Sequence, residues 1–507
     1  MASPHQLQCF PSKPRVFILS DISNEPDDAE SLVRYLLYSN QFRTEGLVAC
    51  TSTWMKTKVC PQDMHKIIDG YEKVVNNLNA HAHPDDPYPA AKYLRSLVKK
   101  GAETYGMTAV GDDIPLSEGA EALLERITSK NKENDPLWIL CWGGTNVLAS
   151  ALHKLSKTHT QTHAAKLRSN LRIYAISDQD DTGLWIRTTY PDLFYICSVH
   201  GWNQYGNATW TGISGDEWYG FDKGGPDPAK ISSQWIRENI QIGPFGRTYP
   251  DFMFIPEGDT PTFLYLIQNG LGVAERPEFG SWGGRYVATH GGASGSRSGS
   301  GVNGHFSDTA DEVVGLDGRS YKSNHATIWR WREAFQVDFA ARMQWSLSSD
   351  LGRANHHPVA IVNGSTGPAP LELEIGAGEV FRLDASASYD PDPDDSLTFK
   401  WYQYKEPSAT QWAVQYEVGE LGIKALNEAG SIVEVQMPPA EKCCVELISR
   451  QAIAKGQLLH LILEVKDDGV PALTTYRRVV IQATNEKLLG GGGGAEAIGD
   501  TMKDVIQ

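Results

Sequence analysis

Residues 16–28 of the chain read Val-Phe-Ile-Leu-Ser-Asp-Ile-Ser-Asn-Glu-Pro-Asp-Asp. The apolar run 16–19 predicts a buried parallel strand, and the apolar spacing after residue 28 predicts a helix. Between the two elements stand four carboxylates within eight residues: Asp21, Glu25, Asp27 and Asp28. Carboxylates this close repel one another unless a cation or protons lie among them. Because ligands bind at the carboxyl ends of strands in open α/β sheets, this turn predicts a binding site.

The oxygen atoms of this turn indicate which cation would suit it. Asn24 adds an amide oxygen to the carboxylates, and hard oxygen ligands suit calcium, with magnesium as the second choice. A plainer interpretation stays open, because acidic residues in the first turn of a helix interact favourably with its dipole. One or two acids satisfy a helix end, however, so the surplus favours a ligand site.

Length and charge limit the classes of protein to which this chain can belong. With 507 residues it is too long for one compact core and should hold two or three domains. Its formal net charge of −16 argues against nucleic acid and against an anionic membrane surface as partners. No apolar run approaches the roughly 18 residues that a membrane span needs. The oligomeric state stays open, a homo-oligomer included.

The N-terminal segment and the cysteines predict a cytoplasmic location. Residues 1–10 contain no positive region followed by an apolar stretch, so no signal peptide is visible. A secreted protein would require that such a segment had been trimmed. The seven cysteines are an odd number and are scattered, which fits free buried thiols in a reducing compartment.

Predicted strands alternate with predicted helices from residue 15 to about 350. The strands are 16–19, 45–51, 137–141, 171–176 and 193–197, and the helices are 61–79, 88–99, 117–129, 145–156 and 327–345. This alternation predicts an α/β domain with a mostly parallel sheet covered on both faces. Polar or glycine-rich turns follow the strands and should converge on one rim of the sheet: 21–28, 51–54, 143–146 and 177–181.

The pattern changes after residue 355. Four segments alternate apolar and polar residues between turn clusters, which predicts an all-β, immunoglobulin-like sandwich: 380–384, 397–402, 460–465 and 476–481. We therefore predict an α/β domain at 15–350, a sandwich at 356–485 and a disordered tail at 486–507. Because their connection is short, the sandwich should pack on the α/β domain as a support or as a wall of its pocket.

Two further segments have more than one interpretation. Residues 291–304 are rich in Gly and Ser, and are either a flexible insertion or a mobile lid. The sandwich has its own acidic turn at 390–395, and a second acidic pair at 467–468. These turns either hold a structural calcium ion or are Asx-rich turns without a metal.

Five segments together resemble the nucleoside hydrolase-like family that carries a cellulose-binding-type C-terminal β-sandwich. They are 20–28, 176–187 with its Ser-Asp-Gln-Asp-Asp and Trp-Ile-Arg parts, Glu-Gly-Asp-Thr-Pro at 257–261, Trp-Gly-Gly-Arg-Tyr at 282–286, and 338–343. The resemblance covers about residues 15–485. It implies a nucleoside hydrolase-like sheet domain followed by the sandwich, and it implies hydrolase chemistry.

The resemblance also implies roles for individual acidic residues. Nucleoside hydrolases place an Asp-x-Asp-x-x-x-Asp-Asp motif after their first strand. By position, Asp27 is the general base for water, Asp28 a calcium ligand and Asp21 the first aspartate of the motif. The second aspartate falls on Ser23, a departure that leaves Asp21 or the adjacent asparagine to supply the missing oxygen. The distal calcium aspartate of those enzymes is most similar to Asp259.

The sugar-binding positions depart further from that family. The asparagine that holds ribose falls near Trp54, so an indole face replaces a hydroxyl partner and a plain ribonucleoside is not the expected ligand. The remaining segments and strand-end turns complete the predicted substrate-binding set: Asn24, Glu25, Trp54, Asn146, Asp178, Gln179, Asp180, Asp181, Trp185, Arg187, Glu257, Trp282 and Arg285.

These residues predict an enzyme that cleaves a glycosidic N- or O-bond of a small or oligomeric glycoside. Asp27 would activate water, and a calcium ion would orient the substrate hydroxyls. Two alternatives stay open: a non-catalytic carbohydrate-binding protein, and a tailoring enzyme that acts on a glycosylated metabolite. The sequence specifies neither the sugar and its leaving group nor a retaining or inverting outcome.

Overall fold

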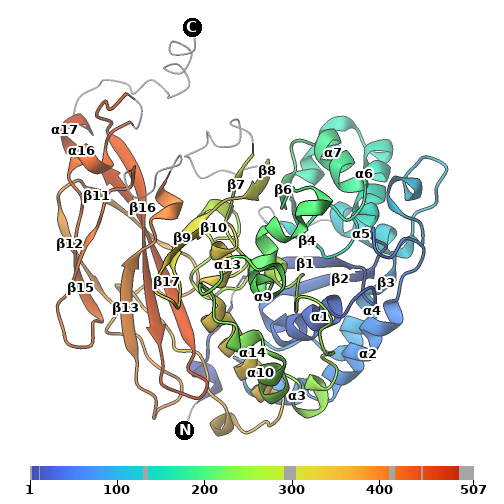
Figure 1. Cartoon of the computed structure of the whole chain (residues 1–507), viewed down its shortest axis with the longest axis horizontal. Coiled ribbons are helices and arrows are strands. Elements are labelled where there is room, and N and C mark those ends of the chain that lie inside the picture. Colours follow the sequence, from blue (N-terminus) through green and yellow to red (C-terminus); the bar gives the residue numbers. More distant parts are fainter. Residues whose placement is uncertain are drawn as a thin grey trace.

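The chain folds into two bodies that lie side by side (Figure 1). The structure is a computed structural model and describes residues 3–10, 12–129, 135–289, 304–409, 417–446 and 449–489. The first body, coloured from blue through green to yellow in Figure 1, is an α/β domain, and the second, coloured orange to red, is a β-sandwich. The predicted fold class is therefore confirmed.

An eight-stranded sheet forms the centre of the α/β domain, in the order β3-β2-β1-β4-β5-β6-β8-β7. Its strands are β1 (Arg15–Ser20), β2 (Arg43–Ala49), β3 (Val98–Lys100), β4 (Leu137–Cys141), β5 (Leu171–Ala175), β6 (Phe194–Cys197), β7 (Tyr286–Ala288) and β8 (His305–Asp308). Neighbouring strands run parallel except for β7 and β8. All six residues of β1 are buried, so the turn after it begins inside the domain.

Helices cover both faces of the sheet because alternate residues of β1 face opposite sides. Val16 and Ile18 pack with one set of helices: α1 (Asp27–Leu37), α2 (Pro61–Glu72), α3 (Val75–Ala80), α4 (Ala91–Leu97), α10 (Ser233–Asn239), α11 (Gly243–Gly246), α12 (Pro261–Leu264), α13 (Ala326–Trp329) and α14 (Arg332–Trp345). Phe17 and Leu19 pack with the other: α5 (Glu118–Thr128), α6 (Asn146–Thr158), α7 (Gln161–Arg168) and α8 (Thr182–Thr189). The short helix α9 spans Asp216–Tyr219.

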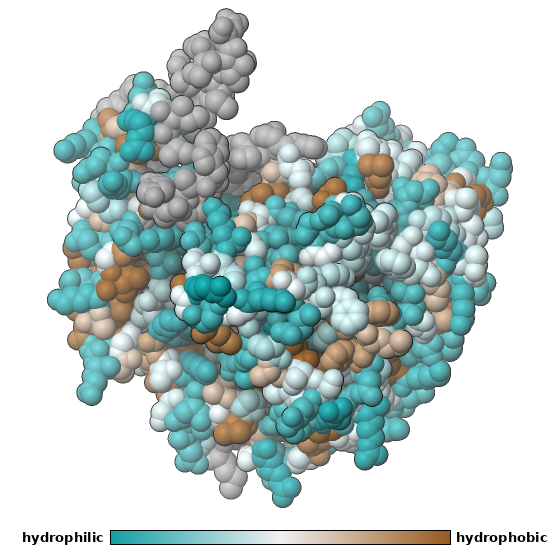
Figure 2. Space-filling view, in the orientation of Figure 1, coloured by the Kyte–Doolittle hydropathy of each residue, from teal (hydrophilic) through white to brown (hydrophobic). Residues whose placement is uncertain are grey.

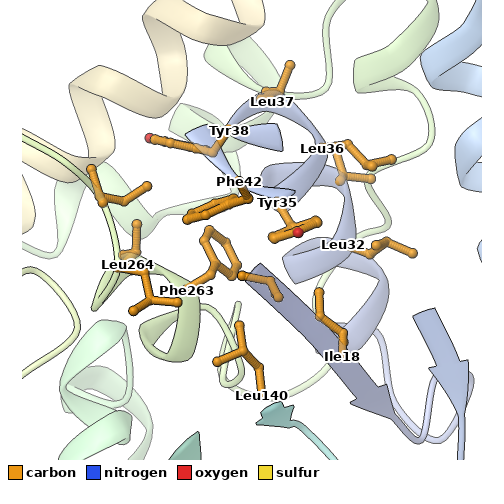
Figure 3. Packing of buried hydrophobic residues seen from close by; sticks show 14 of the residues in the cluster. Ile18, Leu32, Tyr35, Leu36, Leu37, Tyr38, Phe42, Leu140, Phe263 and Leu264 are labelled. Carbon is orange, nitrogen blue, oxygen red and sulfur yellow. The ribbon is translucent and has the colours of Figure 1, made fainter. Parts of the chain in front are cut away.

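Helix α1 is packed on nearly all sides, as Figure 3 shows. Tyr35 stacks on Phe42 with ring centroids 5.4 Å apart and meets Phe263 of α12 edge-on at 5.5 Å. Burial of an aromatic side chain stabilises by about 1.5–3 kcal/mol, and pairs of this geometry add about 0.5–1.5 kcal/mol. This packing fixes the position of the first turn of α1, where Asp27 and Asp28 lie.

Three predicted helices have different bounds in the structure, and one of them, 327–345, is divided into α13 and α14 at Arg330 and Trp331. The predicted helix 61–79 is divided into α2 and α3, because the backbone leaves helical geometry at the β-branched Val74, where φ is −124°. The predicted helix 88–99 ends at Leu97, and the next residues form β3 at the edge of the sheet. Pairing with β2 overrides the helical pattern there.

The sandwich consists of a four-stranded sheet, β11-β17-β16-β13, and a three-stranded sheet, β12-β15-β14. The strands are β11 (Leu371–Gly376), β12 (Val380–Asp384), β13 (Thr398–Gln403), β14 (Gly422–Ala425), β15 (Ile432–Gln436), β16 (Lys455–Lys466) and β17 (Thr474–Thr484), and α16 spans Ala440–Cys443. The four predicted strands correspond to β12, β13, β16 and β17. Strands β11, β14 and β15 were missed, and β11 pairs with β17 in parallel.

The two bodies share one core. Tyr404, Ile462 and Tyr476 of the sandwich belong to the same buried cluster as β1 and α1. Tyr476 meets Trp282 and Trp331 of the α/β domain edge-on, with centroid distances of 6.3 and 5.8 Å. The sandwich therefore packs on the α/β domain, as its short connection predicted.

Strand β17 also joins the α/β domain through backbone hydrogen bonds. The N–H of Tyr476 donates to the carbonyl of Asn269 at 2.8 Å, and that of Arg478 donates to Gly270 at 3.1 Å. The buried side chain of Arg478 donates through Nε to the carbonyl of Leu271 at 2.7 Å. These contacts fix the sandwich against the loop that follows α12.

A buried ion cluster lies where the two bodies meet. Asp311 opens β9 (Asp311–Val314), which pairs with β10 (Ser320–Ser323). Asp311 is 0% exposed and accepts hydrogen bonds from Arg285 at 2.7 Å, Arg330 at 2.7 Å and Tyr404 of the sandwich at 2.6 Å. One carboxylate thus neutralises two guanidinium groups and ties the sandwich to them.

Some sequence predictions fall at the margins of the described structure. Residues 290–303 of the Gly/Ser-rich segment lie outside the described residues, as does the predicted tail beyond residue 489. The first residues assigned to that tail form the short helix α17 (Glu486–Leu489). All seven cysteines are free thiols. Within the described ranges, no helix has both the length and the apolar character that crossing a bilayer demands.

Candidate functional site

Turns at the carboxyl ends of three strands line one cavity of about 390 Å³. Asp21 follows β1, Trp142 follows β4 and Ile176 follows β5. Of the four predicted strand-end turns, 21–28, 51–54 and 177–181 contribute residues to the lining, and 143–146 does not. Its lining residues fall between 21 and 259, so the sandwich supports this domain without forming a wall of the cavity. Eight predicted site residues line it: Asp21, Asn24, Glu25, Asp27, Asp28, Trp54, Gln179 and Asp259.

Three carboxyl groups meet in this cavity. One oxygen each of Asp27, Asp28 and Asp259 lies within 4.8 Å of the other two. Asp28 accepts a hydrogen bond from Ser20 Oγ at 2.5 Å, and Oδ1 of Asp27 accepts one from the backbone N–H of Asp28 at 3.0 Å. Asp259 is 1% exposed, and its Oδ2 is buried without a hydrogen-bond partner. A buried carboxylate oxygen in that situation is destabilising unless a ligand or a proton meets it.

Burial and mutual repulsion raise the pKa values of this cluster. Burial raises the pKa of Asp27 well above its usual value, and the charges of Glu25 and Asp21 raise it further. Burial also raises the pKa of Asp28 and of Asp259, and neighbouring carboxylates add to both shifts. The pKa of Asp21 is raised by burial to about 6. A cation among these groups would favour their ionised forms and remove the repulsion.

Ser23, where the resemblance places an aspartate, does not face the carboxyl cluster. It is exposed and adopts a left-handed backbone conformation with φ of +80°, which is uncommon for a residue with a Cβ atom. Its Oγ donates to Asp63 at 2.6 Å, at the start of α2. Of the two residues that we expected to replace its oxygen, both Asp21 and Asn24 line the cavity.

A buried ion pair holds the loop that carries Asp259. Glu257 has φ of +60°, and its backbone N–H donates to Glu30 Oε2 at 2.9 Å. Its carboxylate accepts a hydrogen bond from Arg34 at 2.8 Å, and Arg34 lies over the ring of Phe339 at 4.5 Å. Glu257 was predicted to bind substrate, but these contacts give it a supporting role behind the cavity.

Aromatic side chains that the sequence analysis missed form much of the cavity wall. Trp202 and Tyr205 lie on η4 (Trp202–Asn207) and Trp210 on η5 (Thr209–Ile213), and Trp142, Trp218, Tyr219 and Phe254 extend the wall. Trp202 and Tyr205 stack at 5.5 Å, and Trp54 meets Trp202 edge-on at 5.6 Å. Trp202 remains 50% exposed, so part of its ring is available to a ligand. The only sequence signal was three Trp within residues 202–218, in a segment without strand or helix periodicity.

The predicted aspartates after β5 line a second cavity, of about 330 Å³, which shares Trp202 with the first. Arg187 binds Asp178 through two hydrogen bonds of 2.5 and 2.6 Å. Asp180 accepts the N–H of the first residue of α8 at 2.9 Å, and Asp181 accepts an N–H of a facing loop at 2.8 Å. These contacts stabilise the turn and leave the aspartates outside the carboxyl cluster.

Six predicted substrate-binding residues line neither cavity: Asn146, Trp185, Arg187, Glu257, Trp282 and Arg285. Trp282 is 1% exposed and packs in the shared core, and Arg285 is bound to Asp311. Nδ2 of Asn146 donates to Thr51 Oγ1 and to the carbonyl of Thr104. Trp185 packs edge-on against Tyr190 at the end of α8. A sequence motif does not distinguish residues that line a cavity from residues that support it.

Comparison with known families decides the ancestry of the chain. The family model described as "Cellulose-binding Sde182, nucleoside hydrolase-like domain" matches residues 15–286, more than half of the chain. The chain belongs to this family. A second model, for the C-terminal domain of the cellulose-binding protein Sde0182, matches residues 380–483, which form most of the sandwich. The resemblance inferred from the sequence is therefore confirmed.

A solved structure has the same architecture as this Sde182-type chain. It is described as a nucleoside hydrolase-related hypothetical protein from Saccharophagus degradans that is associated with carbohydrate metabolism. It is 30% identical, the match covers 93% of this chain and 100% of that one, and the TM-score is 0.73. A search of curated proteins found no match.

Two other solved structures are much less similar. The effector protein XOO4466 is 12% identical, with 66% of this chain and 95% of that chain covered and a TM-score of 0.28. The PKD domain from the KIAA 1837 protein is 19% identical, with 25% and 87% covered and a TM-score of 0.14. Similarity at this level says nothing about the function of this chain.

Proposed function

We propose that the chain is a metal-assisted hydrolase that cleaves a glycosidic N- or O-bond of a small or oligomeric glycoside. The observation that carries this proposal is the meeting of Asp27, Asp28 and Asp259 in a cavity walled by aromatic side chains. Carboxylates provide the base that such a reaction needs, and aromatic faces bind sugar rings or bases. The cavity volume of about 390 Å³ is in the range of small-molecule sites.

The residues present fit a calcium ion. Asp28 and Asp259 would hold it, with Asp21 or Asn24 completing the protein ligands, and Oδ2 of Asp259 is a buried oxygen without a partner. The donors are all oxygen atoms, which suits calcium and, less well, magnesium. When bound, the ion would orient substrate hydroxyls and lower the pKa of the attacking water.

Asp27 is the proposed general base. Its Oδ1 accepts the N–H of Asp28, which fixes the orientation of the carboxylate and leaves Oδ2 to take a proton from water. Glu25 lines the same cavity, and burial followed by the charge of Asp21 raises its pKa. Glu25 is the proposed donor of a proton to the leaving group.

A non-catalytic carbohydrate-binding protein is the second candidate function. It is favoured by the half-exposed ring of Trp202 and by the description of the family as cellulose-binding. A binding protein needs the aromatic wall but does not need a carboxylate such as Asp27 aimed at water. A tailoring enzyme for glycosylated metabolites would use the same chemistry and differs only in its substrate.

The proposal is tested by incubating the protein, with calcium present, with ribonucleosides, aryl glycosides and cello-oligosaccharides. Release of reducing sugar that stops on chelation and resumes with added calcium is the expected result. Saturable binding of an oligosaccharide, measured by calorimetry, without hydrolysis of any panel member would contradict the enzyme and favour the binding protein. If none of these compounds is cleaved but a glycosylated metabolite is, the chain is a tailoring enzyme.

Asp259→Asn is expected to weaken calcium binding in the cavity by about 10–100-fold, the loss that follows removal of important groups at metal sites. The amide removes the negative charge but keeps the shape. Isothermal titration of wild type and variant with calcium measures the effect. Asp112→Asn, which removes an exposed carboxylate that pairs with α6 and does not line the cavity, is the control and should change nothing. Equal titrations of wild type and Asp259→Asn would exclude this residue as a ligand.

Gly258→Ala tests the placement of the base. A Cβ atom at Gly258 would lie 2.8 Å from Oδ2 of Asp27 and 2.9 Å from a ring carbon of Trp210, so the carboxylate must move. A misplacement of about 1 Å lowers catalysis by about 10²-fold. We expect that loss in kcat/KM. Gly352→Ala, where the new atom would meet nothing closer than 3.7 Å, should keep full activity. Full activity of Gly258→Ala would show that Asp27 is not the base.

A further inference from the structure

The β-sandwich contains a second carboxyl cluster, separate from the cavity of the α/β domain. It lies in the turn between β12 and β13, where one oxygen each of Asp390, Asp392 and Asp395 lies within 4.8 Å of the others. The turn after β16 contributes Asp467, which is 4% exposed. An acidic turn alone is often only a solvated surface. Burial and hydrogen bonding of the individual carboxylate oxygens therefore decide whether this cluster is a ligand site.

Two of these oxygen atoms are buried without any donor. Oδ1 of Asp467 accepts three hydrogen bonds, from Asn355 at 2.9 Å, from the N–H of Gly469 at 3.0 Å and from the N–H of Leu473 at 2.9 Å. Its Oδ2 is buried and has no partner. In Asp390, Oδ1 accepts the N–H of Asp392 at 2.8 Å, and Oδ2 is likewise buried and unpartnered. Carboxylate oxygens are rarely left in this state unless a ligand meets them.

The linker between the domains connects the two acidic turns. Nδ2 of Asn355 donates to Asp467, and its Oδ1 accepts the backbone N–H of His356 at 3.0 Å. The same N–H lies 2.8 Å from Oδ2 of Asp392. Asn355 and His356 therefore form hydrogen bonds with both turns, which lie on the same side of the sandwich.

Positive charge near this cluster is scarce. Among the described residues, His356 forms an ion pair with Asp392 at 3.0 Å, and no lysine or arginine lies within ion-pair distance of these carboxylates. In the described part of the chain, buried Asp467 and its three half-buried neighbours have only histidines as nearby basic groups, so a cation would stabilise their ionised forms.

We propose that Asp390, Asp392, Asp395 and Asp467 bind a calcium ion in the sandwich. Carboxylates from two irregular turns can supply the six to eight oxygen atoms that calcium accepts, whereas magnesium demands a near-ideal octahedron. The unpartnered oxygens of Asp390 and Asp467 become ligands. Among the described residues, the imidazole bonded to these carboxylates is that of His356, whose Nδ1 already bonds Asp392, so zinc and other metals that favour nitrogen or sulfur ligands fit poorly.

The site would act on the junction between the domains. His356 carries the hydrogen bond from the cluster and bonds His81 of the α/β domain at 2.8 Å through its other ring nitrogen. His81 and His356 also stack, with centroids 5.1 Å apart. Calcium in the sandwich thus holds the linker against the α/β domain, a structural role independent of hydrolysis.

The test separates this site from the one proposed in the cavity. Calcium is titrated calorimetrically into the full chain carrying Asp259→Asn, in which the cavity site is weakened, and into the same chain with a second substitution. We expect one calcium ion per chain in Asp259→Asn, and an affinity lower by about 10–100-fold when Asp467→Asn or Asp390→Asn is added. Asp394→Asn removes the same charge from an exposed position in the same turn and should leave binding unchanged.

A second measurement covers the case in which a variant does not fold. Calcium should raise the thermal unfolding midpoint of Asp259→Asn and of its Asp394→Asn double variant, but not that of the Asp390→Asn double variant, because binding stabilises only a chain that retains the site. If Asp467→Asn does not fold, Asp390→Asn decides. Absence of calcium binding in Asp259→Asn, or equal binding after both sandwich substitutions, would overturn the proposal. A third outcome is also informative. If the wild-type chain binds one calcium ion and Asp467→Asn abolishes that binding, the sandwich site is supported and the proposed cavity site is contradicted.

Discussion

Asp27→Asn is expected to lower kcat/KM for glycoside hydrolysis by about 10²–10⁴-fold, the usual contribution of a positioned general base. The amide keeps the volume of the side chain and can still accept the N–H of Asp28, so the first turn of α1 should survive. It cannot take a proton from water. The rate of sugar release from whichever glycoside is cleaved measures the loss, and circular dichroism with thermal unfolding checks the fold.

Asp112→Asn and chemical rescue serve as its controls. Asp112 lies on the surface, 62% exposed in its side chain, so its substitution should leave the rate unchanged. Azide or formate, small anions that can enter the cavity, should restore part of the activity of Asp27→Asn by replacing the carboxylate. A variant that keeps more than about half the wild-type rate would assign the base to another residue, because a lost base costs far more.

Asp311→Asn is expected to cost about 3–5 kcal/mol of stability, the range found when one partner of a buried ion pair is removed. The substitution leaves Arg285 and Arg330 facing a neutral acceptor at a buried position, with Glu406, 3.6 Å from Arg330, as the remaining carboxylate. It also weakens the hydrogen bond from Tyr404 of the sandwich to residue 311, so the unfolding of the two domains should become less cooperative. Urea unfolding monitored by tryptophan fluorescence measures the change.

The pH dependence of this effect has a definite sign. Burial alone would raise the pKa of Asp311, but the charges of Arg285 and Arg330 outweigh burial and hold that pKa below its usual value. The contribution of ionised Asp311 to the free energy of unfolding is therefore complete above the unfolded-state pKa of about 3.9. It is lost as the pH falls through the lower pKa of the folded state. The difference between wild type and Asp311→Asn should shrink in acid. Asp317→Asn, which breaks an exposed pair with Arg319, should have a much smaller effect at any pH. A constant difference from pH 7 to about pH 3 would contradict the ion-pair explanation.

The carboxyl cluster could be predicted because it depends on local sequence. The strand before Asp21 and the helix that begins at Asp27 are both clear periodic patterns, and together they place the acids at a strand end. Asp259 came from the family motif alone. Its position beside Asp28 depends on a loop held by the long-range pair of Glu257 with Arg34, which no local pattern contains.

The aromatic wall could not be predicted, for the opposite reason. Trp202 and Trp210 lie on short 3₁₀ segments whose conformation is set by tertiary contacts, not by an apolar period. Several strands were missed on similar grounds. The four-residue strand β8 is too short to show alternation, and the parallel pairing of β11 with β17 joins residues more than a hundred positions apart. Trp282 and Arg285 were assigned to substrate because a motif was interpreted as a binding surface, whereas burial and ion pairing use them in the fold.

Figure 2 shows a surface on which hydrophobic residues occur in small separate groups among hydrophilic ones. Beneath that surface, the shared core has a consequence for biosynthesis. Trp282 and Trp331 are covered by Tyr476, which leaves the ribosome long after the α/β domain has been synthesised. A nascent chain that ends before β17 must therefore keep this apolar surface exposed, and such surfaces promote aggregation during folding. Ribosome-bound intermediates of this protein should depend on chaperones until the last strand emerges.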